Sequence, residues 1–126
     1  MKQIKRLKRG KISLFLAAAV LSLGILSGCG AESKEAKDAR MTGIEQLNAG
    51  NYQDAIDSFG KALDESDGIV NSFELDVLKY RGEAEYKLAD YKAAAQTYGI
   101  LAEVDGGKAE YLYYKAASEA AAGQAE

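Results

Sequence analysis

The sequence contains one cysteine and no histidine, tryptophan or proline. A single cysteine cannot form an intramolecular disulfide, so an exported domain of this chain must be stable through packing alone. Without histidine the chain lacks the commonest general base and the commonest metal ligand. This excludes a Ser-His-Asp or Cys-His catalytic centre and any His-containing zinc site. We therefore expect no metal and no cofactor.

Acidic residues are absent from the first 28 positions, which hold six of the 16 basic residues. The remaining 98 residues carry all 19 acidic and ten basic side chains, a formal charge near −9. Nucleic-acid binding requires clustered lysine and arginine, so the acidic body argues against a nucleic-acid partner.

The N-terminus has the order of an export signal. A basic stretch over residues 1–11 precedes an apolar run from Ile12 to Leu26. As a helix this run would rise about 22 Å, which is shorter than the ~30 Å hydrocarbon core of a bilayer. That length favours a signal-peptide core over a resident membrane span, and the preceding positive charge keeps the N-terminus cytoplasmic.

The four residues Leu26, Ser27, Gly28 and Cys29 follow in the order aliphatic, small, small, cysteine. They resemble the lipobox of bacterial lipoproteins. The resemblance implies cleavage of the signal peptide 1–28 and diacylglycerol on the Cys29 sulfur, a two-chain anchor on the extracytoplasmic face of the cell membrane. Residues 29–35 would then be a lipidated tether. The alternative is that Cys29 is an incidental small residue near the end of an uncleaved anchor.

Helical composition dominates from Ala36 onward, because alanine, glutamate, lysine and leucine are frequent and no alternating strand pattern persists. Breaks in the pattern predict an all-α domain over 36–122, with helices at about 36–49, 52–66, 72–88, 91–104 and 108–122. Asn51 and Asp90 precede two of these helices and are expected to be N-caps.

An internal repeat relates residues 50–59 to residues 89–98, 39 positions later, and places Gly43 over Gly82. The pattern resembles the tetratricopeptide repeat, a 34-residue pair of antiparallel helices, with about five extra residues in the 64–72 connection. The resemblance implies an α-α superhelix of about two and a half repeats, at 36–67, 75–106 and a partial 109–126. A generic helical hairpin bundle is the alternative.

The resemblance also assigns packing roles to small and aromatic positions that recur in both units. These are Gly43, Tyr52, Ala55, Phe59 and Ala62 in the first unit, and Gly82, Tyr91, Ala94, Tyr98 and Leu101 in the second. Two departures from the family pattern are Asp67 and Gly106, which stand where the repeat usually carries proline.

First helices of such repeats line a groove that holds an extended peptide or a partner's helix. The expected groove residues are Lys37, Arg40, Ile44, Leu47 and Asn48, then Asp76, Lys79, Glu83, Tyr86 and Lys87, then Glu110, Tyr113 and Ala117. Repeats that clamp a C-terminal carboxylate have asparagine four residues after a basic residue. Here Ile44 follows Arg40 and Glu83 follows Lys79, so that clamp is absent.

The function predicted from these features is a non-catalytic adaptor that is anchored by lipid and binds an unknown envelope protein or peptide. A solute-binding lipoprotein is an alternative, although 98 residues leave no second lobe to close over a ligand. A piece of a longer repeat protein is another. An enzyme is disfavoured, because acidic residues are expected on helix surfaces and not beside an apolar pocket that raises a pKa. A tyrosine-rich last helix (Tyr111, Tyr113 and Tyr114, with Tyr86 nearby) could be a docking surface, a dimer contact or the edge of a continuing chain.

Overall fold

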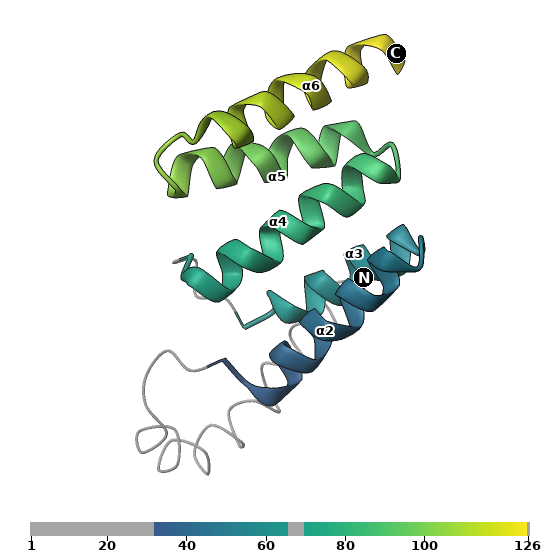
Figure 1. Ribbon diagram of the computed structural model, residues 1–126, viewed down its shortest axis with the longest axis vertical. Helices are drawn as coiled ribbons and strands as arrows, with labels where there is room; N and C mark the ends of the chain where they lie inside the picture. The colour runs from purple at the N-terminus through teal and green to yellow at the C-terminus, as the bar shows by residue number, and fades with distance from the viewer. Residues whose placement is uncertain (1–31, 66–69, 126) are drawn as a thin grey trace, which may run out of the picture. The chain divides into compact units, whose positions relative to one another are not determined.

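The computed structural model describes residues 32–65 and 70–125, which form α-helices and no strand. The helices are α2 (Lys34–Asn48), α3 (Tyr52–Ala62), α4 (Ser72–Lys87), α5 (Tyr91–Val104) and α6 (Ala109–Ala125). Each packs against the next, so that antiparallel hairpins lie side by side (Figure 1). The all-α, tetratricopeptide-like fold expected from the sequence is confirmed. The predicted signal peptide and the lipobox with Cys29 lie outside the described residues.

Helix N-termini are capped by three of the four residues that precede helices α2 to α5. Asp90 accepts a hydrogen bond from the Ala93 amide at 3.3 Å, as predicted, while Ser33 and Asn71 cap α2 and α4. Asn51 also occupies the N-cap position of α3, as predicted, but its side chain makes no capping bond. Its backbone geometry resembles that of Asp90, but a charged carboxylate is the stronger acceptor.

The turns inside the two hairpins have the same backbone geometry. Gly50 has a φ of +82° and Ala89, 39 residues later, has a φ of +67°. In each turn the following amide donates back to the last turn of the helix, from Asn51 to the Gln46 carbonyl and from Asp90 to the Glu85 carbonyl. Ala89 therefore adopts the left-handed conformation that glycine occupies in the first turn, at a cost of about 1–2 kcal/mol.

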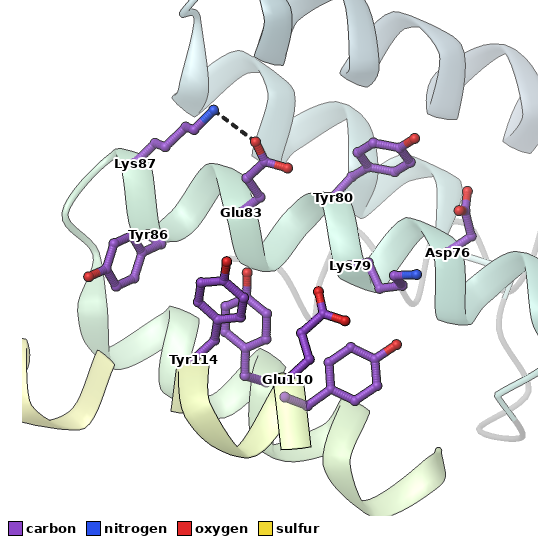
Figure 2. A pocket seen from close by; sticks show the side chains of 10 residues that line it. Asp76, Lys79, Tyr80, Glu83, Tyr86, Lys87, Glu110 and Tyr114 are labelled. Carbon is purple, nitrogen blue, oxygen red and sulfur yellow. Dashed lines mark ion pairs between the residues drawn. The ribbon is translucent and has the colours of Figure 1, made fainter. Parts of the chain in front are cut away.

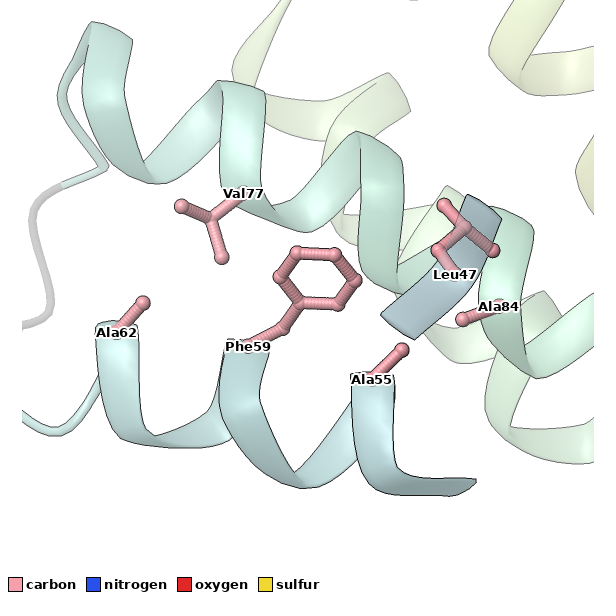
Figure 3. Packing of buried hydrophobic residues seen from close by; sticks show 6 residues of the cluster. All are labelled: Leu47, Ala55, Phe59, Ala62, Val77 and Ala84. Carbon is pink, nitrogen blue, oxygen red and sulfur yellow. The ribbon is translucent and has the colours of Figure 1, made fainter. Parts of the chain in front are cut away.

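Two core clusters share helix α4. The first surrounds Phe59, whose ring points from α3 toward α4 and is fully buried (Figure 3). Its members are Leu47, Ala55, Phe59, Ala62, Val77 and Ala84. The second cluster joins α4, α5 and α6 and consists of Leu78, Ala94, Tyr98, Leu101, Ala102 and Tyr111.

Glycine allows the first helix of each hairpin to approach an aromatic ring on the second. A Cβ on Gly43 would lie 2.5 Å from Phe59 Cε1, and a Cβ on Gly82 would lie 3.1 Å from Tyr98 Cζ. Tyr52 and Tyr91 are half-buried, and the Tyr91 ring meets Tyr86 edge-on at 5.3 Å. Within the described residues, no helix has the length and apolar character needed to cross a membrane.

Candidate functional site

The larger of two neighbouring pockets lies between α4 and α6, with one residue contributed by α5 (Figure 2). Its volume is about 450 Å³. The lining combines five tyrosines with five charged residues: Asp76, Lys79, Tyr80, Glu83, Tyr86, Lys87, Tyr98, Glu110, Tyr111 and Tyr114.

A second pocket of about 380 Å³ lies between α2 and α4. It is lined by Lys37, Arg40, Met41, Ser72, Phe73 and Asp76. Because Asp76 lines both pockets, the two adjoin on one side of α4. We call the combined feature the α4 groove.

Stacked aromatic pairs support the groove where α3 meets α4 and where α5 meets α6. Phe59 stacks with Tyr80 at a centroid distance of 6.0 Å, and Tyr98 stacks with Tyr114 at 5.1 Å. Tyr98 follows Phe59 by 39 positions and Tyr114 follows Tyr80 by 34 positions. The repeat thus reproduces the same side-chain stack at each interface.

Charged side chains in the groove differ in how they are paired. Arg40 on α2 lies 2.6 Å from Asp76 Oδ2 on α4, and its guanidinium carbon lies 5.6 Å from the centre of the Tyr80 ring. Lys87 pairs with Glu83 at 2.8 Å, the one ion pair drawn in Figure 2. Among the described residues, neither Lys79 nor Glu110 has an ion-pair partner.

Tyr98 brings a neutral hydroxyl to the pocket. Burial raises the pKa of this phenol far above its ordinary value, and the nearby Tyr114, Glu83 and Glu110 raise it further by disfavouring a phenolate. Tyr98 therefore stays protonated at physiological pH and serves the pocket as a hydrogen-bonding group and an aromatic surface.

Glu74 and Glu85 correct the expectation that acidic residues follow the helix surfaces, because their exposed fractions are only 8% and 2%. Thr97 donates to Glu85 Oε1 at 2.5 Å, and Arg81 donates to Glu85 Oε2 at 3.2 Å. Burial raises the pKa of Glu85, while the Thr97 and Arg81 hydrogen bonds oppose the rise. The burial of Glu85 was not predicted, because it arises from the packing of α4 on α5. The helical periodicity of α4 alone does not reveal that packing.

Glu85 has a neutral counterpart in the first hairpin. Ser58 donates to Gln46 Oε1 at 2.6 Å, and Gln46 and Ser58 precede Glu85 and Thr97 by 39 positions each. The buried carboxylate therefore occupies a structural hydrogen-bonding position inside a hairpin, and it does not line either pocket.

Most of the predicted groove residues line the two pockets. Asp76, Lys79, Glu83, Tyr86, Lys87 and Glu110 line the larger one, and Lys37 and Arg40 line the smaller one. The other five lie elsewhere: Ile44 packs against the first core cluster, Leu47 is buried within it, Asn48 is exposed at the end of α2, Ala117 is half-buried, and Tyr113 is 68% exposed outside both pockets.

Sequence reasoning missed Tyr80 as a groove residue and left the roles of Tyr111 and Tyr114 open. The 34-residue spacing between Tyr80 and Tyr114 would have been a usable signal. Helical spacing would also have separated Tyr113 from its neighbours, because Tyr111 and Tyr114 share a helix face and Tyr113 does not.

The side chains in the groove are suited to recognition. They offer tyrosine rings, hydroxyls and charges of both signs. Over residues 32–65 and 70–125, no group of three acidic residues is placed to hold a metal ion. No protein-family model, curated protein or solved structure matches the chain. What the groove binds is therefore inferred from its own residues.

Proposed function

We propose that the protein is a lipid-anchored lipoprotein on the extracytoplasmic face of the cell membrane. Its tetratricopeptide-like helices bind a peptide segment of another envelope protein, without catalysis. The observation that carries the proposal is the α4 groove, two adjoining pockets that meet at Asp76, reach α2 and α6, and are lined by tyrosines and charged residues.

Three properties of the groove favour a peptide over a solute. The groove is open and extends across three helices, whereas small ligands are mostly enclosed by their sites. Tyrosine is enriched among the residues that dominate binding energy at protein interfaces. Charges of both signs along the groove can position an extended chain that carries complementary side chains.

The anchor is proposed from the basic N-terminus, the short apolar run and the lipobox that ends at Cys29. Helix α2 is capped at Ser33, only four positions after Cys29. Those positions can span at most about 14 Å. A lipid on Cys29 would therefore hold the start of α2 near the membrane surface, which keeps the domain within reach of partners located there.

Site-specific photocrosslinking in cells tests the binding proposal. A photoreactive phenylalanine analogue at Tyr86, which lines the groove, should give a discrete adduct with an envelope protein. The same analogue at Glu103, which is exposed on α5 outside both pockets, serves as the control and should give none. If neither position gives an adduct in a correctly processed protein, the adaptor proposal is wrong.

The anchor is tested by Cys29→Ala. This variant should remain uncleaved or be mislocalised, and it should lose metabolic labelling with a radioactive fatty acid, while circular dichroism still reports a helical domain. Ser27→Ala keeps a small residue in the lipobox and should be processed like the wild type. Normal processing and labelling of Cys29→Ala would refute the lipoprotein assignment.

A further inference from the structure

A carboxylate and a tyrosine, one turn apart on α4, hold an arginine of this chain. Asp76 pairs with the Arg40 guanidinium at 2.6 Å, and the Tyr80 ring lies beneath the same guanidinium. The Tyr80 ring is supported from the other side of the interface by its stack with Phe59. Arg40 in α2 thus fills a site made of one carboxylate and one supported ring.

The same pair recurs on α6. Glu110 and Tyr114 follow Asp76 and Tyr80 by 34 positions each, and Tyr114 is supported by its stack with Tyr98. Lys79 follows Arg40 by 39 positions, the separation that relates the first two repeat units.

This second pair holds no cation among the described residues. Over residues 32–65 and 70–125 neither Lys79 nor Glu110 forms an ion pair, and the cation–π contacts of Arg40 and Lys108 are with Tyr80 and Tyr111. Tyr114 is 37% exposed and lines the pocket. Glu110 and Tyr114, the counterparts on α6 of the carboxylate and ring that bind Arg40, are therefore accessible, although the exposed Tyr113 ring meets the Tyr114 ring edge-on at a centroid distance of 5.4 Å.

The pocket lining carries three carboxylates and two lysines, a small net negative charge that favours a cation. Glu83, Glu85 and Glu110 each act on the hydroxyl of Tyr98, which stacks on Tyr114. The 98 residues after Gly28 carry a formal charge near −9, which attracts basic segments over a longer range.

We propose that the pocket between α4 and α6 binds an arginine side chain of the partner segment, stacked on Tyr114 and paired with Glu110. This inference rests on the proposed function and specifies the chemistry of the peptide. Arginine fits better than lysine, because a planar guanidinium can stack on a ring and pair with a carboxylate at the same time, as Arg40 does.

Selection of peptides on the full chain in detergent micelles tests the proposal. A random nonapeptide phage library should yield ligands in which arginine recurs at one position. The best ligand is then synthesised with arginine and with citrulline, its neutral isostere. Isothermal titration calorimetry should show binding about tenfold weaker for the citrulline peptide, the effect expected of one cation–π contact combined with an ion pair.

Three variants assign the effect to the site. In Glu110→Gln the preference for the arginine peptide should fall from about tenfold to about threefold, because the ion pair is lost while the contact with Tyr114 remains. The control is Glu119→Gln, which removes an exposed carboxylate of the same helix outside the pocket and should preserve the tenfold difference. Lys79→Met removes the lysine that occupies the repeat position of Arg40. This variant should bind the arginine peptide about two- to fivefold more strongly.

The outcomes separate this inference from the proposed function. Selected peptides without a recurring arginine, or equal binding of the arginine and citrulline forms, would overturn the arginine site while leaving a peptide-binding groove. Failure to select any peptide would overturn both. A citrulline penalty that stays near tenfold in Glu110→Gln would remove Glu110 from the site.

Discussion

Gly43 and Gly82 occupy the same repeat position, but the side chains opposite them leave different amounts of space. A methyl group at Gly43 would lie 2.5 and 2.7 Å from two atoms of the buried Phe59 ring. At Gly82 the nearest atoms, from Tyr98 and Thr97, lie between 3.1 and 3.3 Å away. The first hairpin is therefore packed more tightly at this position than the second.

We expect Gly43→Ala to lower the free energy of unfolding by about 2 kcal/mol, because Phe59 has no free volume into which it can move. Gly82→Ala should cost less than about 1 kcal/mol, since the higher helix propensity of alanine offsets part of a milder clash. Gly60→Ala is the control: nothing lies within 4 Å of its added Cβ, so it should stabilise the protein. Urea denaturation measures all three. An equal loss at Gly43 and Gly82 would contradict the packing difference.

Glu85 makes stability depend on pH with a defined sign. Because burial raises its pKa in the folded protein above the ordinary value near 4.5, the folded state binds this proton more tightly than the unfolded state does. The contribution of Glu85 to the free energy of unfolding is therefore most favourable below the unfolded pKa and falls as the pH rises toward the folded pKa.

Glu85→Gln would place a neutral glutamine opposite Thr97 in the second hairpin, like the Gln46–Ser58 pair of the first hairpin. The stability of the variant relative to the wild type should therefore be greater at pH 7 than at about pH 3.5. Urea denaturation across this range measures the difference, with Glu103→Gln on the surface of α5 as a control for loss of charge. A relative stability that does not change with pH would show that the Arg81 and Thr97 hydrogen bonds compensate the burial of Glu85.

At the scale of the helices, the ends were predicted to within about four residues wherever the sequence contains a glycine break or a capping side chain. Helix α3 is the largest deviation, since it ends at Ala62 and was expected to reach about residue 66. Helix α2 begins at Lys34 because Ser33 caps it, two residues before the predicted start. A helix-forming sequence pattern can continue past the residue at which a helix begins or ends. The pattern alone therefore does not reveal where capping or tertiary packing sets that boundary.

The cap positions give a matched pair of variants. Asn71 accepts a hydrogen bond from the Glu74 amide at 2.9 Å, whereas the Asn51 side chain makes no such bond. Asn71→Ala should therefore lower the free energy of unfolding by about 1 kcal/mol, and Asn51→Ala should change it by much less. Thermal denaturation followed by circular dichroism compares the two, and equal losses would argue against capping as the cause.

The candidate site was predictable to the extent that it follows repeat register. The resemblance to the tetratricopeptide repeat placed Lys79, Glu83 and Tyr86 on the helix face that lines the larger pocket. It failed for Leu47, which lies in the last turn of α2 and is buried where α3 and α4 converge. Whether a residue on an inward face meets solvent or another helix depends on how neighbouring helices pack, and one helix's sequence does not contain that information.

At the scale of the whole described domain, α4 is the element that the other parts share. It contributes Val77 and Ala84 to the first core cluster and Leu78 to the second. It also supplies six of the ten residues that line the larger pocket. Helix α4 therefore packs against both α3 and α5 while it presents the groove.

Because α4 belongs to both core clusters and lines the groove, occupancy of the groove is linked to the folding stability of the domain. Loss of either core cluster disturbs the helix that presents most of the groove, so unfolding has to release whatever is bound there. A ligand at a hundred times its dissociation constant then raises the free energy of unfolding by about 2.7 kcal/mol. The melting temperature of the protein is accordingly a label-free signal of occupancy, and extracts or peptide pools can be screened by heat before the partner's identity is known.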